Sequence, residues 1–312
     1  MPVGPGQYNG LVRSAIGGTY EVELHPGGAV VEASLRGRLK REQRTGDAVV
    51  AGDRVVVREQ EDGGHTIEAV AERRSELARR APGRGRHRGA KVLVANVDQL
   101  VAVFAVAEPP PRLRMLDRFL VLAEANGVDA LIVANKADLG ADQERAAFGL
   151  YESIGYPVLF TSATTGQGVR VLNERLCGRV SVLAGPSGVG KSSLLNTIQP
   201  GLQLRTAAVS EAVRKGRKGR HTTVSARLIP LDCGGYVADT PGLRELGLWG
   251  IEPGELDLYF PEMADHLTAC RFAGSCTHTH EPGCAVREAV EAGAVPTARY
   301  ESYVALLSGD DA

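Results

Sequence analysis

The sequence lacks any apolar run long enough to cross a lipid bilayer, although 43% of its 312 residues are hydrophobic. Its first ten residues, MPVGPGQYNG, contain neither a basic segment nor an apolar core, so we expect no signal peptide. These absences predict a soluble chain without a membrane partner. We also expect the chain to be cytoplasmic and monomeric. Its length suggests two or three domains.

Cysteine is scarce, and the five cysteines are an odd number. Three of them, Cys270, Cys276 and Cys284, fall within fifteen residues. This crowding favours a metal site in a reducing compartment over a disulfide framework. The other two, Cys177 and Cys233, are expected at ordinary core or surface positions.

Net charge is nearly absent, at −1, and by itself predicts no polyanionic partner. The basic residues are nevertheless concentrated. Residues 71–91 hold seven Arg and one Lys against two Glu, and residues 214–220 hold five basic residues and no acid. Such runs are either solvated surface and linker or contacts to a nucleic-acid backbone. The Arg- and Gly-rich stretch 73–89 is interpreted as a mobile linker.

Residues 1–75 lack a helical period and have only two aromatic residues, Tyr8 and Tyr20. Short alternating stretches broken by Gly predict five strands of an OB-fold β-barrel. With so few rings for base stacking, an RNA contact of this barrel would depend on backbone and shape. Residues 76–90 are assigned to the basic linker.

Residues 91–247 alternate between strand and helix patterns, which predicts an α/β domain with mostly parallel strands. Residues 248–312 are polar, carry Cys and His, and end in a helical stretch. The expected strands are 98–106, 128–134, 157–160, 180–184, 224–231 and 235–239. The expected helices are 111–127, 141–154, 168–177 and the one that follows residue 190.

The stretch GPSGVGKSS (185–193) follows an apolar strand and fits a phosphate-binding loop (P-loop). Its glycines let backbone N–H groups face a phosphate at a helix N-terminus. Lys191 should reach the β- and γ-phosphates, and Ser192 should ligate Mg²⁺. The predicted contacts of this loop are Gly185, Pro186, Ser187, Gly188, Val189, Gly190, Lys191, Ser192 and Ser193.

A D-x-x-G motif ends the stretch YVADTPG (236–242). Asp239 should hold Mg²⁺ through water, and the Gly242 N–H should meet the γ-phosphate. The first switch is expected in GRKGRHTT (216–223), where either Thr222 or Thr223 should bind Mg²⁺ and sense the γ-phosphate.

A glutamine that orients the attacking water is missing after Gly242, where the chain has Leu243. An apolar side chain cannot orient water, so intrinsic hydrolysis should be slow. His221 is the nearest replacement, unless it is an ordinary exposed loop histidine. The candidate catalytic residues are therefore His221, Thr222, Thr223 and Lys191.

The stretch LIVANKADLG (131–140) contains an N-K-x-D motif. The Asp138 carboxylate can accept hydrogen bonds from N1–H and the exocyclic amine of guanine, which adenine does not match. Asn135 can bond the major-groove edge of the purine, and the Lys136 stem can cover the base. In TSA (161–163), Ser162 and the Ala163 N–H form the second base loop, with the N–H directed at guanine O6.

The order of these motifs along the chain is base, base, phosphate, switch, switch. Strand-end loops meet at the carboxyl edge of a parallel sheet whatever their order in the chain. The sequence therefore predicts a circularly permuted P-loop GTPase domain. The permutation makes the second switch, at 239–247, lead directly into the C-terminal segment.

The stretch CRFAGSCTHTHEPGC (270–284) predicts a closed structural zinc site made by Cys270, Cys276, His278 and Cys284. A small tail with few apolar residues would gain folding energy from one zinc ion. His280 would crowd the turn before Cys284, so we assign it to solvent or RNA.

Together RGRLKR, ANVDQLV, NKADL, GPSGVGKSSLLN, GRHTT, DTPG and EPGCAV resemble the ribosome small subunit-dependent GTPases. The resemblance covers nearly the whole chain and implies an OB-fold, a permuted GTPase domain and a zinc domain. It implies GTP hydrolysis to GDP, stimulated by the small ribosomal subunit and its rRNA during late maturation of that particle, with His221 replacing the glutamine. One departure is the spacing of Cys270 and Cys276, which is five residues where the family has four.

Two other functions remain open from the sequence. The P-loop is also how guanylate-kinase-type nucleotide kinases begin, although such a kinase does not need N-K-A-D or D-T-P-G. A zinc-dependent nucleic-acid-binding module with an incidental nucleotide site is the other alternative. Phosphorylation of added GMP would identify the kinase, and stimulation of GTP turnover by DNA rather than by ribosomal particles would identify the module.

Overall fold

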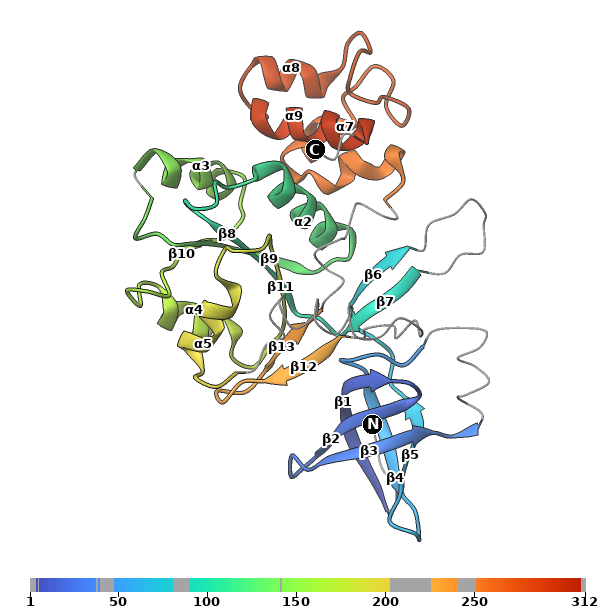
Figure 1. Cartoon of the computed structure of the whole chain (residues 1–312). Helices are drawn as coiled ribbons and strands as arrows, with labels where there is room; N and C mark the ends of the chain where they lie inside the picture. Colours follow the sequence, from blue (N-terminus) through green and yellow to red (C-terminus); the bar gives the residue numbers. More distant parts are fainter. Residues whose placement is uncertain are drawn as a thin grey trace, which may run out of the picture.

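The computed structural model describes residues 4, 6–37, 39, 48–80, 90–140, 142–202, 226–240 and 251–309. Three domains follow one another from the N-terminal barrel at the bottom of Figure 1 to the C-terminal domain at its top. Within those residues, no helix combines the length and apolarity needed to span a membrane.

The N-terminal domain is a five-stranded barrel. Its strands are β1 (Gln7–Ile16), β2 (Thr19–His25), β3 (Val30–Leu35), β4 (Arg54–Glu59) and β5 (His65–Val70). The order β1-β2-β3-β5-β4 closes because β4 pairs back onto β1, and β3 and β5 run parallel. Alternate residues such as Val12, Val22 and Val57 fill the interior and are fully buried. The predicted OB-fold barrel is confirmed.

The central domain has a parallel sheet in the order β10-β9-β8-β11-β13, with β12 antiparallel beside β13. Its strands are β8 (Gln99–Ala105), β9 (Asp129–Asn135), β10 (Val158–Phe160), β11 (Val180–Ala184), β12 (Arg227–Pro230) and β13 (Tyr236–Asp239). Every residue of β8 is buried, as its continuous apolar run predicts for a central parallel strand.

Helices cover both faces of this sheet (Figure 1). They are α2 (Leu113–Ala125), α3 (Asp142–Ser153), α4 (Val169–Leu176) and α5 (Lys191–Ile198). Side chains of α2 and α3, such as Leu120 and Phe148, share one apolar core, whereas Leu172 of α4 and Leu195 of α5 belong to the other. The predicted α/β domain is confirmed, and the carboxyl ends of its parallel strands share one edge.

The barrel and the central domain share a continuous eleven-stranded sheet, because β1 pairs with β12 at Ser14 and Arg227. Their backbones also meet at Gly52, where an added Cβ would lie 2.0 Å from the Ala95 carbonyl oxygen. Only glycine fits this approach, since its φ is also +93°. The barrel is therefore fixed at two places, to β12 of the large sheet and to Ala95 of the chain segment that precedes the central sheet.

The interpretation of 73–89 as a linker is wrong for residues 76–80. They form β6 (Glu76–Arg80), which pairs antiparallel with β7 (Ala90–Ala95). Leu77 and Val94 are fully buried in the same core as α2. The sequence did not predict this strand, because a single buried Leu among arginines does not give the alternating apolar pattern by which a strand is recognised. Residues 81–89 lie outside the described part of the chain.

The C-terminal domain is built from short helices around one apolar cluster. Its elements are η2 (Pro253–Tyr259), η3 (Pro261–Met263), α7 (Ala264–Leu267), α8 (Ala285–Glu291) and α9 (Thr297–Ser308). Arg299 of α9 is fully buried and donates to Glu262 at 2.6 Å and to Asp117 of α2 at 2.5 Å. This network holds the C-terminal domain against the central domain. Separating the two domains would leave buried charges without their partners, which is costly.

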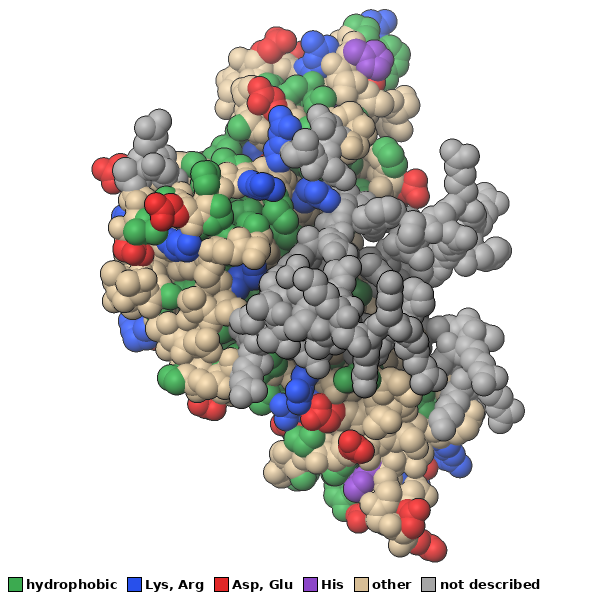
Figure 2. Space-filling view, viewed as in Figure 1, with side chains coloured by type: hydrophobic (Ala, Val, Ile, Leu, Met, Phe, Trp, Pro, Cys, Tyr) green, Lys and Arg blue, Asp and Glu red, His purple; other side chains and the backbone are tan. Residues whose placement is uncertain are grey.

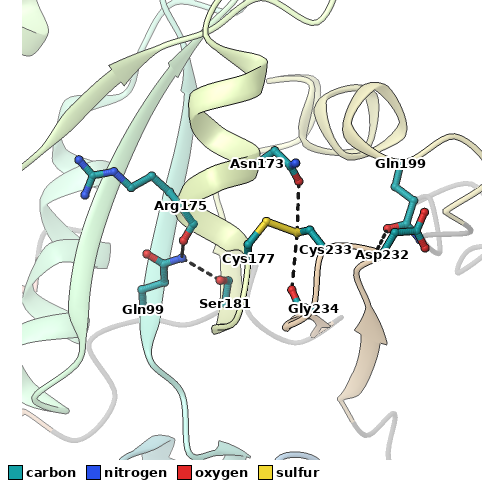
Figure 3. Close-up of a disulfide and its surroundings, with 9 residues drawn as sticks. All are labelled: Gln99, Asn173, Arg175, Cys177, Ser181, Gln199, Asp232, Cys233 and Gly234. Atoms are coloured by element: carbon teal, nitrogen blue, oxygen red, sulfur yellow. Dashed lines mark hydrogen bonds between the residues drawn. A yellow bond between two sulfur atoms is a disulfide. The ribbon is translucent and has the colours of Figure 1, made fainter. Parts of the chain in front are cut away.

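Cys177 and Cys233 form a disulfide, with their Cα atoms 5.4 Å apart (Figure 3). The sequence analysis placed these two cysteines at ordinary core or surface positions and did not predict their bond. Cys177 follows α4 and Cys233 lies in the turn between β12 and β13, so only the parallel pairing of β11 with β13 brings them together. Their separation of 56 residues conceals that contact in the sequence.

Candidate functional site

The N-K-x-D loop follows β9 at the carboxyl edge of the sheet. Lys136 has a φ of 59°, and its Nζ contacts the Glu108 carbonyl oxygen in the loop after β8. The Ala137 N–H donates to the Thr161 carbonyl oxygen at 3.0 Å, which ties this loop to the one after β10. Asp138 is exposed, as a side chain that meets a ligand must be.

Asn135 connects three loops of the site through one buried side chain. Its Nδ2 donates to the Val189 carbonyl oxygen of the P-loop at 2.7 Å. Its Oδ1 accepts from the Thr161 hydroxyl at 3.1 Å. The sequence indicated a contact from Asn135 to the purine edge, whereas these bonds direct its amide into the protein. In this structure Asn135 holds the base loop against the P-loop.

The second base loop is equally well ordered by its own contacts. Ser162 is fully buried, and its hydroxyl accepts from the Thr165 N–H at 3.1 Å. Its N–H donates to the Gln167 carbonyl oxygen at 2.9 Å, which closes a tight turn. The Ala163 carbonyl oxygen accepts from Thr197 of α5 at 3.5 Å, so this loop also lies against the helix of the P-loop.

The P-loop needs its glycines for two physical reasons. Gly185 has a φ of +139°, and a Cβ there would lie 2.0 Å from the Val103 carbonyl oxygen of β8. Gly190 has a φ of +92°, and a Cβ there would lie 2.4 Å from Asn135 Nδ2. The loop therefore passes close to the Val103 backbone and to the Asn135 side chain, while its residues at 186–188 stay half-buried or exposed. This shape is typical of a phosphate cradle at a helix N-terminus.

Lys191 is the first residue of α5, with Gly190 as the N-cap. Its Nζ donates to the carbonyl oxygens of Gly185 and Pro186, both at 2.7 Å. The ammonium group thus lies across the mouth of the loop, where it can meet phosphate oxygens. Ser192 is half-buried and Ser193 is exposed, one after the other in the first turn of α5.

Asp239 ends β13, which lies beside β11, the strand that leads into the P-loop. The D-x-x-G aspartate is therefore at the same sheet edge as the P-loop. Gly242 and Leu243, together with His221, Thr222 and Thr223 of the first switch, lie outside the described residues.

Cys270, Cys276, His278 and Cys284 gather in the C-terminal domain, with all four ligand atoms within 4.8 Å of one another. The Cys270 and Cys284 sulfurs are 3.9 Å apart, and each is 3.5 Å from His278 Nδ1. A tetrahedral zinc ion requires about 3.8 Å between sulfurs and about 3.6 Å between sulfur and nitrogen. The cluster could therefore hold zinc, and the five-residue spacing before Cys276 does not displace Cys270.

The surroundings of this cluster fit a metal site. His278 Nε2 lies 3.1 Å from Asp257 Oδ2, the kind of carboxylate contact that orients a ligating imidazole. Burial raises the pKa of the Cys276 thiol to about 12 and also raises the pKa of the Cys284 thiol. Thiols in such a cluster become thiolates when a cation binds them. His280 is exposed, and its Nδ1 lies 2.9 Å from the Thr279 hydroxyl.

Two acidic residues beside this cluster were missed in the sequence. Asp257 is distant from the cysteines in the chain and gives no motif. Glu281 accepts from the N–H groups of Thr277 at 2.8 Å and Thr279 at 3.1 Å, and so fixes the loop that carries His278. Its place directly after the T-H-T-H run could have indicated such a cap.

The profile of the RsgA GTPase family matches residues 70–249, more than half of the chain. A protein of Gemmatimonas aurantiaca named small ribosomal subunit biogenesis GTPase RsgA is 55% identical over 300 residues, covering 95% of each chain. A protein of Moorella thermoacetica with the same name is 47% identical over 299 residues, covering 96% of each.

The crystal structure of YjeQ from Thermotoga maritima matches with a TM-score of 0.79 at 38% identity, covering 97% of this chain and 98% of that one. The structure of YloQ, a circularly permuted GTPase, matches with a TM-score of 0.75 at 32% identity, covering 99% and 97%. These matches favour a GTPase over the nucleotide kinase and the nucleic-acid-binding module. The chain belongs to the RsgA GTPase family.

Proposed function

We propose that the chain hydrolyses GTP to GDP and phosphate at the carboxyl edge of the central sheet and acts in the maturation of the small ribosomal subunit. The observation that carries the proposal is the buried Asn135 amide. It joins the base loop to the P-loop at 2.7 Å and to Thr161, the residue before the second base loop, at 3.1 Å. One side chain thus fixes how far a guanine-reading element lies from a phosphate-binding element.

Guanine is read by Asp138, with the Ala163 N–H directed at O6. Asp138 is exposed, whereas Ser162 and the backbone around it are held by buried hydrogen bonds. A rigid second loop would help to distinguish guanine from other bases. An N–H donor at a fixed position can bind only a base that has a carbonyl oxygen at that place. The Lys136 stem covers one face of the base.

Phosphate binding is assigned to residues 185–193, with Lys191 leaving the loop carbonyls for the β- and γ-oxygens of GTP. This exchange replaces two neutral acceptors by charged ones, which are stronger partners for an ammonium group. Mg²⁺ would be held by Ser192, by Thr222 or Thr223, and through water by Asp239. Together these cations neutralise the charge that develops on the phosphate oxygens.

Water activation is the weak step of this site, because Leu243 stands where a polar side chain would orient the nucleophile. His221 is the residue of this chain that we assign to that task. Slow hydrolysis in isolation and faster hydrolysis with a partner that orders the switches follow from this arrangement.

The partner that we assign is the small ribosomal subunit with its rRNA. The Gemmatimonas and Moorella relatives are named small ribosomal subunit biogenesis GTPases, which supports this assignment. Figure 2 shows Lys and Arg side chains over the C-terminal domain, the central domain and the upper end of the barrel, with acidic side chains among them and several more at the lower tip of the barrel. RNA would contact the basic side chains. Such a role places the chain in the cytoplasm.

One zinc ion on the cluster of Cys270, Cys276, His278 and Cys284 would stabilise the fold of the C-terminal domain.

Base specificity tests the proposal. Asp138→Asn replaces two acceptor oxygens by one acceptor and one donor, which fits xanthine better than guanine. The variant should turn over XTP in preference to GTP and keep its fold. Asp142→Asn, a change at an exposed aspartate at the start of α3, is the matched control and should retain GTP preference. An Asp138→Asn enzyme that still prefers GTP would contradict the assignment of the base loop.

A further inference from the structure

The disulfide between Cys177 and Cys233 lies at the opposite end of the sheet from the nucleotide site. Cys177 precedes β11, whose far end enters the P-loop, and Cys233 precedes β13, whose far end carries Asp239. The bridge therefore does not touch the nucleotide loops. It closes a loop, residues 177–233, that contains the complete P-loop, α5 and the first switch sequence.

The bridge lies at the surface of the central domain. Cys233 is exposed and Cys177 is half-buried, and Figure 3 shows the bridge at the junction of α4 with the β12–β13 turn. The other three cysteines of the chain all belong to the metal cluster. Of the five cysteines, Cys177 and Cys233 are therefore the two that remain for redox chemistry.

The backbone around the bridge holds its position without it. The Gly178 N–H donates to the Gly234 carbonyl oxygen at 2.9 Å, and the Tyr236 N–H donates to the Arg179 carbonyl oxygen at 2.8 Å. These bonds keep β11 and β13 in register when the sulfurs are apart. Opening the bridge would therefore leave two thiols close enough to pair again.

We propose that Cys177 and Cys233 form a reversible thiol–disulfide site that takes a dithiol as its reductant, and that the oxidised form protects the P-loop half of the GTPase domain against unfolding. Disulfides in a reducing compartment are as a rule transient or redox-sensing rather than permanent. The choice of compartment rests on the proposed function, whereas the chemistry of the pair does not.

The exchange balances in two steps. A thiolate of the dithiol attacks the exposed Cys233 sulfur, the bond between the two protein sulfurs breaks, and Cys177 leaves as a thiolate that takes up a proton. The second thiol of the reductant then attacks the mixed disulfide and releases Cys233. The dithiol loses two electrons and becomes a cyclic disulfide, and the protein gains two thiols. An oxidised dithiol reverses both steps.

The stabilising effect follows from the length of the closed loop. Joining residues 56 apart restricts the unfolded chain, and the native backbone already accommodates the bridge. For a domain of this size, opening the bridge should lower Tm by roughly 5–15 °C. GTP turnover at 25 °C should change by less than about twofold, because the strands keep their register.

The test uses the full chain with bound zinc, in oxidised and in reduced dithiothreitol. After denaturation with a chelator, alkylation should count three thiols in the oxidised form and five in the reduced form, with the missing two in one cross-linked peptide. Tm should fall on reduction while zinc content stays constant. Cys233→Ser should show the lower Tm in both buffers, and Cys177→Ser should behave identically.

Five reactive thiols in both buffers would overturn the proposal, and so would a Tm that reduction leaves unchanged. A Cys233→Ser protein whose Tm still falls on reduction would also overturn it, because the effect would then come from the zinc thiols. Turnover separates the two proposals: an oxidised protein that shows the redox behaviour but hydrolyses no GTP contradicts the proposed function alone.

Discussion

Removal of the Asn135 amide should cost free energy, which will be observed as lower stability of the GTPase domain, weaker nucleotide binding or both. Asn135→Ala deletes one bond of 2.7 Å to the Val189 carbonyl oxygen and one of 3.1 Å from the Thr161 hydroxyl. Asn135 and Thr161 are at most 1% exposed, so water cannot easily replace the lost partner. Each buried group left unpaired costs about 1–3 kcal/mol, which gives about 2–6 kcal/mol in total.

Urea unfolding and GDP titration would divide this cost between the fold and the ligand site. We expect the unfolding free energy to fall by at least about 2 kcal/mol, or an equivalent loss to be found in GDP affinity, where 1.4 kcal/mol is a factor of about 10. Asn196→Ala, at an exposed position of α5 near the P-loop, is the matched control and should change stability by no more than about 0.5 kcal/mol.

A double-mutant cycle identifies the bridge itself. Thr161→Val keeps the shape of the side chain and removes its hydroxyl, so it leaves only the Asn135 Oδ1 without this donor. Because the two residues share a bond, their combined effect should differ from the sum by about 0.5–3 kcal/mol. Additive effects, or an Asn135→Ala protein with wild-type stability and GDP affinity, would refute the reasoning.

Two further predictions concern the phosphate and metal sites. Lys191→Ala should reduce GTP turnover by at least roughly a hundredfold, because the variant lacks a positive charge that stabilises the transition state. Its unfolding curve should stay close to that of the wild type. Turnover within threefold of the wild type would contradict the P-loop assignment. His278→Ala should lower bound zinc from about one ion per chain, whereas His280→Ala should retain it, since only His278 meets two sulfurs at 3.5 Å. Metal analysis of both purified variants decides this, and zinc lost only from the His280 variant would reverse the assignment.

The sequence predicted those parts of the molecule whose chemistry dictates residue type and spacing. A continuous apolar run identified β8 as a buried strand, and alternation identified the barrel. The gathering of Cys270, Cys276, His278 and Cys284 was predicted because cysteine and histidine in a short loop have few other uses. The order of the base and phosphate motifs was sufficient to predict the circular permutation, because the loops after parallel strands meet at one edge of the sheet whatever their order in the chain.

What the sequence concealed depends on contacts between distant segments. Leu77 of β6 has its partner strand beyond an Arg-rich stretch, so its pairing was invisible. Asn135 belongs to a base motif, yet its bonds are to Val189 and Thr161, and only the folded sheet shows this. Cys177 and Cys233 carry no local signal either, because a parallel strand pair brings them together across 56 residues.

The most direct test of the proposed function is the rate of GTP hydrolysis by the purified chain with and without purified small ribosomal subunits. Because Leu243 cannot orient water, the isolated chain should hydrolyse GTP slowly. Small subunits should raise the rate by at least roughly tenfold, as a partner that orders the switch residues would do. Large subunits should not, and Lys191→Ala should remain inactive with either particle. No stimulation by small subunits, or equal stimulation by large ones, would contradict the account.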